Sequence, residues 1–175
     1  YWYTFEPTAF KRGLKEKYPL VVAIHGFSCS GEFFAQNSGW HHVGEERGAF
    51  VVYPNAYPFK RSAARGRFGT DIAATPSWNS GMFSVEADPQ GPDEISFFQQ
   101  MIAMIEAKYP IDPERIYVTG HSNGAMMTQR IMRFWPSKFA GFAPVGGMES
   151  RTEAVPEPDD GCLRNVWYTM GEFDL

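Results

Sequence analysis

The chain has 175 residues, of which 43% are apolar and 16% aromatic, and its formal net charge is −4 at pH 7. This length suits one globular domain with a sizeable core, and the composition excludes a disordered chain. The net charge gives no reason to expect a nucleic-acid partner. The longest apolar run, Leu20–Ile24, is far shorter than the roughly 20 residues that span a bilayer.

Short β-branched and apolar runs predict the strands. An early run at 1–5 is followed by near-continuous apolar runs that indicate strands buried on both faces. In chain order these runs are YPLVVAIHG (18–26), GAFVVYPNA (48–56), ERIYVTGHS (114–122), a weaker KFAGFAPVGG (138–147) and NVWYTMGEFD (165–174).

Helical patterns lie between these strands. A broken pattern runs from 33 to 46, a cleaner one from 92 to 109 and a third from 126 to 134. Apolar residues recur every three or four positions in the second pattern, which Pro110 ends. Strands that alternate with helices predict an α/β fold with a mostly parallel sheet and helices on both faces.

One long connection interrupts this alternation. We expect residues 1–175 to form a single domain and residues 55–91, rich in Gly, Pro, Ser and Arg, to be a loop insertion that shapes the binding site. The basic residues of the insertion could meet an anionic substrate, although a solvated loop explains them better. They are Lys60, Arg61, Arg65 and Arg67.

The stretch Gly120-His121-Ser122-Asn123-Gly124 carries the chemistry. Gly-x-Ser-x-Gly is a weak pattern alone, but here it follows a predicted strand and precedes a predicted helix, as in a nucleophile elbow. The tight turn needs small residues beside the serine, and the helix directs its first N–H groups toward it. We therefore interpret Ser122 as a nucleophile, against the alternative that it only caps the helix.

Residues for an oxyanion hole follow another strand end. His25-Gly26-Phe27-Ser28 comes directly after the first buried strand. A turn there can present the backbone N–H of Phe27, together with that of Asn123, to a tetrahedral intermediate. The side chain of Phe27 would then line the acyl pocket.

A carboxylate follows the last predicted strand. Asp174 comes after Ser122 in the chain, as the hydrolase order Ser…Asp…His requires. We predict that Asp174 is the acid of a catalytic triad. Glu172, Asp160 or a surface-loop role for Asp174 are the alternatives.

Several stretches together carry a family resemblance: PLVVAIHG, SGW, FVVYPNA, WNSG, IDPERIYVTGHSNGAMM and FAGFAPVGG. The chain resembles the polyhydroxybutyrate-depolymerase-type esterases of the α/β-hydrolase superfamily, which are similar to feruloyl and acetylxylan esterases. The resemblance runs from about Leu20 to Asp174. It implies an α/β-hydrolase fold, and places Trp78 and Asn79 near the mouth of the site. From the residues alone, Trp78 is equally well explained as a packing residue that pins the long loop.

The resemblance also implies a function. We expect a secreted or exported serine esterase that hydrolyses polyhydroxyalkanoate, feruloyl, acetyl-polysaccharide or related short acyl esters through an acyl-enzyme, without metal or organic cofactor. The expected partner is a small or polymeric ester, with no nucleic acid or membrane. A non-catalytic binding module or an acyltransferase on the same scaffold are the alternatives.

The base of the triad is the missing part. All four histidines precede Ser122, whereas the family pattern puts the catalytic histidine after the acid. Leaving the strand that contains 165–170 as an apolar edge would also be unusual. We therefore expect the chain to be incomplete at its C-terminus, lacking a strand and a helix. Cys29 and Cys162 are expected to be free thiols, with a disulfide as the alternative.

Overall fold

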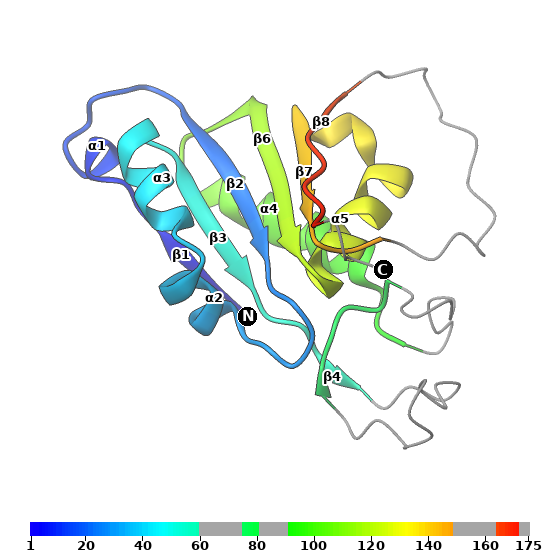
Figure 1. Cartoon of the computed structure of the whole chain (residues 1–175). Helices are drawn as coiled ribbons and strands as arrows, with labels where there is room; N and C mark the ends of the chain where they lie inside the picture. Colours follow the sequence, from blue (N-terminus) through cyan, green and yellow to red (C-terminus); the bar gives the residue numbers. More distant parts are fainter. Residues whose placement is uncertain (60–74, 81–90, 149–163, 172–175) are drawn as a thin grey trace, which may run out of the picture.

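The structure is a computed structural model that describes residues 1–59, 75–80, 91–148 and 164–171. A six-stranded sheet runs through its centre in the order β1-β3-β2-β6-β7-β8 (Figure 1). β1 pairs antiparallel with β3, and all other neighbours in this sheet are parallel. Its strands are β1 Trp2–Phe5, β2 Tyr18–Ile24, β3 Phe50–Pro54, β6 Ile111–His121, β7 Gly141–Val145 and β8 Asn165–Val166.

The predicted strands are all found, but β6 and β8 differ in length from the prediction. β6 begins before the predicted segment, at Ile111, whereas β8 is reduced to two residues. An isolated bridge between Val145 and Thr169 continues the alignment of β8 with β7. β8 pairs only with β7 in the described part of the chain, and both of its residues are exposed.

Helices cover both faces of the sheet, as the alternation predicts. Their bounds are α1 Thr8–Lys11, α2 Gly31–Asn37, α3 Trp40–Arg47, α4 Glu94–Lys108 and α5 Asn123–Phe134, followed by a 3₁₀ turn at Pro136–Lys138. α5 begins three residues before its apolar pattern does, directly after the proposed nucleophile. The broken pattern at 33–46 corresponds to α2 and α3, which Gly39 separates in a left-handed conformation (φ 73°).

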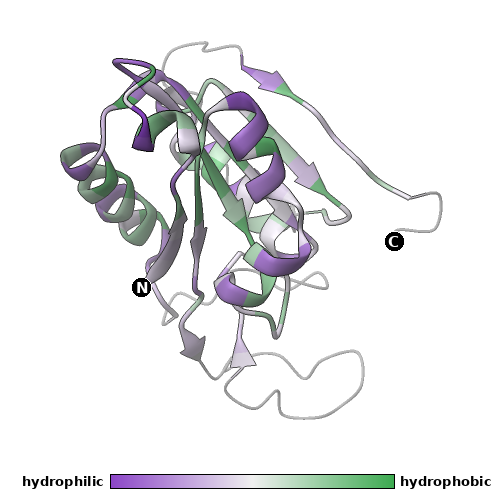
Figure 2. Ribbon diagram, turned by 90° about the vertical axis from the view of Figure 1, so that its left-hand side faces the viewer, coloured by the Kyte–Doolittle hydropathy of each residue, from purple (hydrophilic) through white to green (hydrophobic). Residues whose placement is uncertain are grey.

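Alternate side chains of β2 and β3 supply two cores. On one face Leu20, Val22 and Ile24 pack with side chains of α4 and α5. On the other face Val21 and Ala23 pack with side chains of α2 and α3. Successive residues of β2 and β3 are buried, so both faces of these strands are apolar, and much of the ribbon of the central strands is accordingly green in Figure 2. Strands of this kind are buried by helices on both sides, and so the sheet holds the strand ends rigidly.

The α2 and α3 layer does not extend across the whole sheet. Over β6, β7 and β8 an apolar groove remains, lined by residues that include Trp40, Tyr117, Phe142 and Trp167. Trp167 is 75% exposed and Tyr117 is 38% exposed. This half of the face is therefore uncovered by the described residues.

The two regular segments of the 55–91 insertion pair with each other. β4 (Pro58–Phe59) and β5 (Thr75–Pro76) form a two-stranded antiparallel sheet with Pro58 opposite Pro76. Trp78, Asn79 and Ser80 follow β5 and are buried. The insertion thus returns to the body of the molecule before α4 begins.

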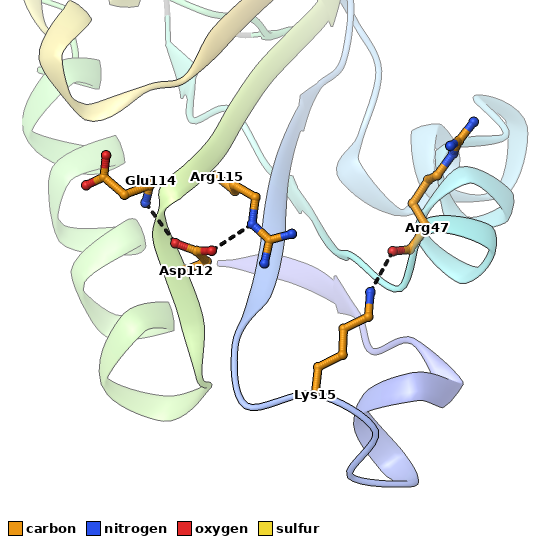
Figure 3. Close-up of polar contacts among 5 residues, drawn as sticks. All are labelled: Lys15, Arg47, Asp112, Glu114 and Arg115. Atoms are coloured by element: carbon orange, nitrogen blue, oxygen red, sulfur yellow. Dashed lines mark hydrogen bonds and ion pairs between the residues drawn. The ribbon is translucent and has the colours of Figure 1, made fainter.

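The amino-terminal ends of the parallel strands carry short polar contacts (Figure 3). Asp112 accepts hydrogen bonds from the backbone N–H of Glu114 at 3.1 Å and from Nε of Arg115 at 2.6 Å. These bonds lower the pKa of Asp112. Lys15 donates to the carbonyl oxygen of Arg47 at 3.1 Å. These contacts shape turns at the edge of the sheet opposite Ser122.

A helix long and apolar enough to cross a membrane was not found among the described residues.

Candidate active site

Ser122 lies in a strained turn between β6 and α5. Its backbone angles are φ 56° and ψ −117°, a region that residues other than glycine rarely adopt. The N–H of Ser122 donates to the carbonyl oxygen of Val145 at 2.9 Å, which ties the turn to the end of β7. Strain of this kind persists only where the surroundings hold it, and it clusters at functional sites.

Glycines surround this turn because there is no room for side chains. A Cβ on Gly120 would overlap the carbonyl group of Gly124, and a Cβ on Gly124 would overlap that of Ile24. A Cβ on Gly147, after β7, would overlap the carbonyl oxygen of Ser122 itself. The two glycines of the Gly-x-Ser-x-Gly pattern are therefore needed for the turn to pack against β2 and α5.

The hydroxyl of Ser122 is not used for structure. Ser122 occupies the N-cap position of α5, but its side chain accepts no capping hydrogen bond. Among the described residues the hydroxyl has no hydrogen-bond partner, and the residue is only half-buried. The alternative that this serine merely caps the helix is not supported. The turn therefore places, at the carboxyl edge of the sheet, a hydroxyl group that makes no hydrogen bond with the described residues.

The turn after β2 lies directly beside Ser122. A Cβ on Gly26 would lie 3.3 Å from the carbonyl oxygen of His121 and 3.5 Å from Cβ of Ser122. Phe27 is the next residue and is half-buried, and Asn123 begins α5. No acceptor for the backbone N–H of Phe27 or Asn123 lies within the described residues. The two amides proposed for the oxyanion hole thus belong to neighbouring turns.

His25 is a structural residue at the base of this turn. It is fully buried, and its Nε2 accepts the N–H of Ala56 at 3.2 Å. That bond assigns the ring proton to Nδ1, which donates to the carbonyl oxygen of Gly26 at 2.7 Å. Burial lowers the pKa of His25, so the ring is neutral at pH 7. His25 braces the loop and is not placed to act as a base.

The other histidines make no contact with the Ser122 hydroxyl in the structure. His121 is exposed at the end of β6. His41 and His42 stack on each other in α3, with their ring centroids 4.0 Å apart, and Nδ1 of His41 lies 3.0 Å from the carbonyl oxygen of Ala35. The structure therefore identifies no base among the four histidines.

Trp78 and Asn79 are buried beneath the site. Trp78 has no exposed surface and packs against Phe98 of α4 with ring centroids 5.4 Å apart. Its indole N–H donates to the carbonyl oxygen of His25 at 2.9 Å. The side chain of Asn79, 7% exposed, donates to the carbonyl oxygen of Pro92 at 3.2 Å. These contacts favour the packing explanation of Trp78 over a position at the mouth of the site.

The side chain of Asn123 connects Trp78 to the nucleophile turn. Its Oδ1 accepts the backbone N–H of Trp78 at 2.7 Å, and its Nδ2 donates to the carbonyl oxygen of Trp78 at 3.2 Å and to Oγ of Ser80 at 3.1 Å. From the sequence only the backbone N–H of Asn123 was expected to take part, and the role of this side chain was missed. Its burial, which requires partners for both ends of the amide, is evident only in the structure.

Several candidate residues lie outside the described residues. They are Asp174 with its alternatives Glu172 and Asp160, the four basic residues of the insertion, and Cys162. Cys29, which follows Ser28 in the turn after β2, is a half-buried free thiol. Groups of three or more His, Cys, Asp or Glu side chains that could hold a metal were not found in the parts of the chain that the structure describes.

Comparisons with known proteins show that the chain is similar to several hydrolases. The model of the prolyl oligopeptidase family matches residues 85–169. Poly(3-hydroxyalkanoate) depolymerase C from Paucimonas lemoignei is 33% identical over 135 residues, which cover 77% of this chain and 29% of the relative. Feruloyl esterase B from Talaromyces stipitatus is 27% identical over 161 residues, which cover 92% of this chain and 40% of the relative.

Solved structures agree on the fold. The acetyl xylan esterase from Aspergillus awamori superposes with a TM-score of 0.63 at 21% identity, covering 89% of this chain and 52% of that one. A ferulic acid esterase superposes with a TM-score of 0.59, also at 21% identity, covering 83% and 53%. The chain thus spans about half of these structures and less than half of the two sequence relatives.

Proposed function

Since the chain belongs to the α/β-hydrolase superfamily, in the group of the polyhydroxyalkanoate depolymerases and the feruloyl and acetylxylan esterases, we propose that it hydrolyses carboxylic esters with Ser122 as nucleophile. The observation that carries this proposal is the strained backbone of Ser122, whose hydroxyl has no structural partner among the described residues. A chain does not maintain such a turn for helix capping, because an unstrained serine caps a helix better.

The reaction would proceed through an acyl-enzyme. Oγ of Ser122 attacks the ester carbonyl carbon while a histidine accepts the hydroxyl proton. The carbonyl oxygen becomes an oxyanion, which accepts hydrogen bonds from the backbone N–H groups of Phe27 and Asn123. The bond to the alkoxy oxygen then breaks, and the alcohol leaves with the proton. Water attacks the acyl-enzyme by the same route and releases the acid.

The position of Asn123 adds a second source of stabilisation. Its N–H is at the N-terminus of the 12-residue α5, where the helix dipole is positive. The developing negative charge would therefore meet both a hydrogen-bond donor and a favourable potential. Gly26 brings the other donor close to Ser122, because a Cβ there would lie 3.3 Å from the carbonyl oxygen of His121 and 3.5 Å from Cβ of Ser122.

We propose that the base is a histidine outside these 175 residues and that Asp174 orients it. His25 is buried and neutral with both ring nitrogens engaged, and the remaining histidines do not contact Ser122. Chain order puts Asp174 after Ser122 and five residues past Thr169, which aligns with the end of β7. Asp174 could then hold the imidazole in the tautomer that accepts the serine proton.

The proposed substrates are esters of short or aromatic acids. The related proteins carry the names of poly(3-hydroxyalkanoate) depolymerase, feruloyl esterase and acetylxylan esterase. Phe27 would form one wall of the acyl pocket, and both short aliphatic and feruloyl groups suit an aromatic wall. We also propose that the protein is exported, as its resemblance to this group of esterases implies.

A covalent serine probe tests the proposal. The full-length protein is incubated with a fluorophosphonate and its intact mass is measured, with Ser122→Ala as the control. We expect one probe mass at Ser122 in the unaltered protein and none in the variant, together with release of acid from p-nitrophenyl acetate. Absence of both labelling and turnover would instead favour a binding module on this scaffold. Transfer of the acyl group to an added alcohol in preference to water would indicate an acyltransferase.

A further inference from the structure

The proposed oxyanion hole is assembled from two distant parts of the chain. Phe27 is in the turn after β2, and Asn123 begins α5 after β6. Two donors stabilise an oxyanion well only if their separation is fixed before the reaction, because reorganising them later would cost the stabilisation that they provide. The contacts that hold one turn relative to the other therefore matter for the reaction.

The buried segment 75–80 contacts both turns. On the β2 side, the indole N–H of Trp78 donates to the carbonyl oxygen of His25 at 2.9 Å, and the carbonyl oxygen of Pro76 accepts the N–H of Ser28 at 2.9 Å. Phe27 thus lies between two residues that this segment holds. On the α5 side, the backbone N–H of Trp78 donates to Oδ1 of Asn123, and the backbone carbonyl oxygen of Trp78 accepts from Nδ2 of the same side chain.

These bonds lie where water does not compete. Trp78, His25 and Asn123 have no exposed surface. In such surroundings a hydrogen bond is stronger than in water, and the loss of one partner leaves the other unsatisfied at a high cost. The contacts of Trp78 consequently restrict the relative position of the two turns more than surface contacts could.

We propose that Trp78 is a positioning residue: through His25 on one side and the Asn123 side chain on the other, it fixes the spacing of the two oxyanion-hole donors. This inference rests on the proposed function, since it assigns a role in the same reaction. It differs from a role in binding, because Trp78 would act on the carbonyl oxygen of every substrate and touch none of them.

Trp78→Phe in the full-length protein tests the proposal. The variant keeps a buried aromatic ring and the backbone bonds to Asn123, but it removes the indole N–H together with part of the ring volume, for which the control below is needed. We expect kcat to fall about 10- to 100-fold, as when reacting groups are slightly displaced, while KM changes less than about threefold. The loss should be the same for acetyl and for larger acyl esters. Amide hydrogen exchange in His25–Ser28 should become faster.

Phe98→Leu is the matched control. Phe98 is equally buried and contacts the Trp78 ring, but it makes no polar contact with either turn. We expect a lower unfolding temperature with kcat within about threefold of the unaltered protein. If Phe98→Leu reduces kcat as strongly as Trp78→Phe at a similar loss of stability, the role of Trp78 is only structural and the proposal is wrong.

A second variant approaches the contact from the other side. Asn123→Ala leaves the backbone N–H of residue 123 in place and removes the side chain that holds Trp78, so kcat should fall while KM is kept. This variant decides the question if Trp78→Phe does not fold. Unchanged kcat in either folded variant overturns the proposal.

If the proposed esterase function is wrong, the unaltered protein itself will lack activity, which distinguishes this outcome from failure of the positioning role. The unaltered protein would then show neither turnover nor labelling by a fluorophosphonate. Hydrogen exchange still tests the positioning role in that case. Faster exchange in His25–Ser28 in Trp78→Phe, but not in Phe98→Leu, supports the connection, and unchanged exchange in both refutes it.

Discussion

Two turns at the carboxyl edge of the sheet each contain a serine with positive φ. They are the non-glycine residues with this conformation in the described parts of the chain, Ser28 at 57° after β2 and Ser122 at 56° after β6. Ser122 is enclosed by backbone groups that its neighbouring glycines admit. Ser28 is exposed and its N–H is held by the carbonyl oxygen of Pro76.

The difference shows how the same backbone strain is maintained in two ways. Around Ser122 the packing of three strand ends leaves no alternative conformation. Around Ser28 the conformation depends on a segment about 50 positions later in the chain, so it depends on tertiary structure. Both turns therefore depend on tertiary contacts, but the first is marked in the sequence by its glycines and the second carries no such mark.

Replacing each serine by glycine should separate the effect of backbone strain on stability from the effect of the hydroxyl on catalysis. Glycine tolerates positive φ, so we expect both Ser122→Gly and Ser28→Gly to raise the free energy of unfolding by about 1 kcal/mol. Ser122→Gly should also reduce kcat by about 10⁶-fold, the effect of removing a triad serine, whereas Ser28→Gly should change it less than about threefold. Denaturant unfolding and ester hydrolysis measure both. Equal rates in the two variants would contradict the assignment of the nucleophile.

Removing the proposed acid should have the next largest effect. Asp174→Asn should lower kcat by up to about 10⁴-fold, because the histidine would no longer be held in the productive tautomer. The free energy of unfolding should remain within about 0.5 kcal/mol of its original value. Steady-state kinetics in the full-length protein measure the rate. Normal hydrolysis in this variant would assign the role to another carboxylate, for which Glu172→Gln and Asp160→Asn are the comparison variants.

Adding one methyl group to each turn should distinguish their packing. In Gly124→Ala the new Cβ would overlap the main chain of β2, which cannot move aside, so we expect a loss on the order of 3 kcal/mol. In Gly26→Ala the nearest atoms would lie 3.3 to 3.6 Å away, and a loss of about 1 kcal/mol or less is expected. Denaturant unfolding of both variants checks the difference. A similar loss in both would show that the two turns are equally constrained.

The smallest predicted effect concerns His25 and pH. Burial lowers the pKa of His25 from 6.5, so the unfolded chain binds the proton at a pH where the folded protein does not. The unfolded state then binds more protons, and the free energy of unfolding falls as pH drops below 6.5, by less than about 1.4 kcal/mol per pH unit. In His25→Gln this contribution should vanish.

Denaturant unfolding between pH 7 and pH 5 measures this contribution. Asp93 and Asp112, whose pKa values hydrogen bonds lower from 3.8, lose their stabilising contribution only at more acidic pH and do not interfere. The same pH dependence in the original protein and in His25→Gln would show that His25 is not responsible.

Local patterns in the sequence predicted the sheet and the nucleophile turn. β2 and β3 are apolar on both faces, and the glycines around Ser122 have a steric role that spacing alone suggests. α4 was predicted from its apolar spacing and from Pro110 after its end, and in the structure Asp93 caps its start, accepting the Ser96 N–H at 3.1 Å.

What the sequence did not predict depends on contacts between distant segments. α1 has four residues and no capping side chain, and β4 and β5 have two residues each with a proline in both. Such short elements form only when neighbours hold them. The connection of Asn123 to Trp78 joins positions far apart in the chain, and neither residue carries a local signal of the other.

The pairing of β4 with β5 also has a practical consequence for protein engineering. Pro58 lies opposite Pro76 and Phe59 opposite Thr75, so the two residues that flank the stretch 60–74 are paired with each other. Closing a longer loop between fixed ends costs little, about 0.6 kcal/mol for each doubling of its length. Libraries that vary the length and composition of residues 60–74 would therefore begin and end on one pair of strands, which recommends this stretch for grafting new substrate-recognition loops.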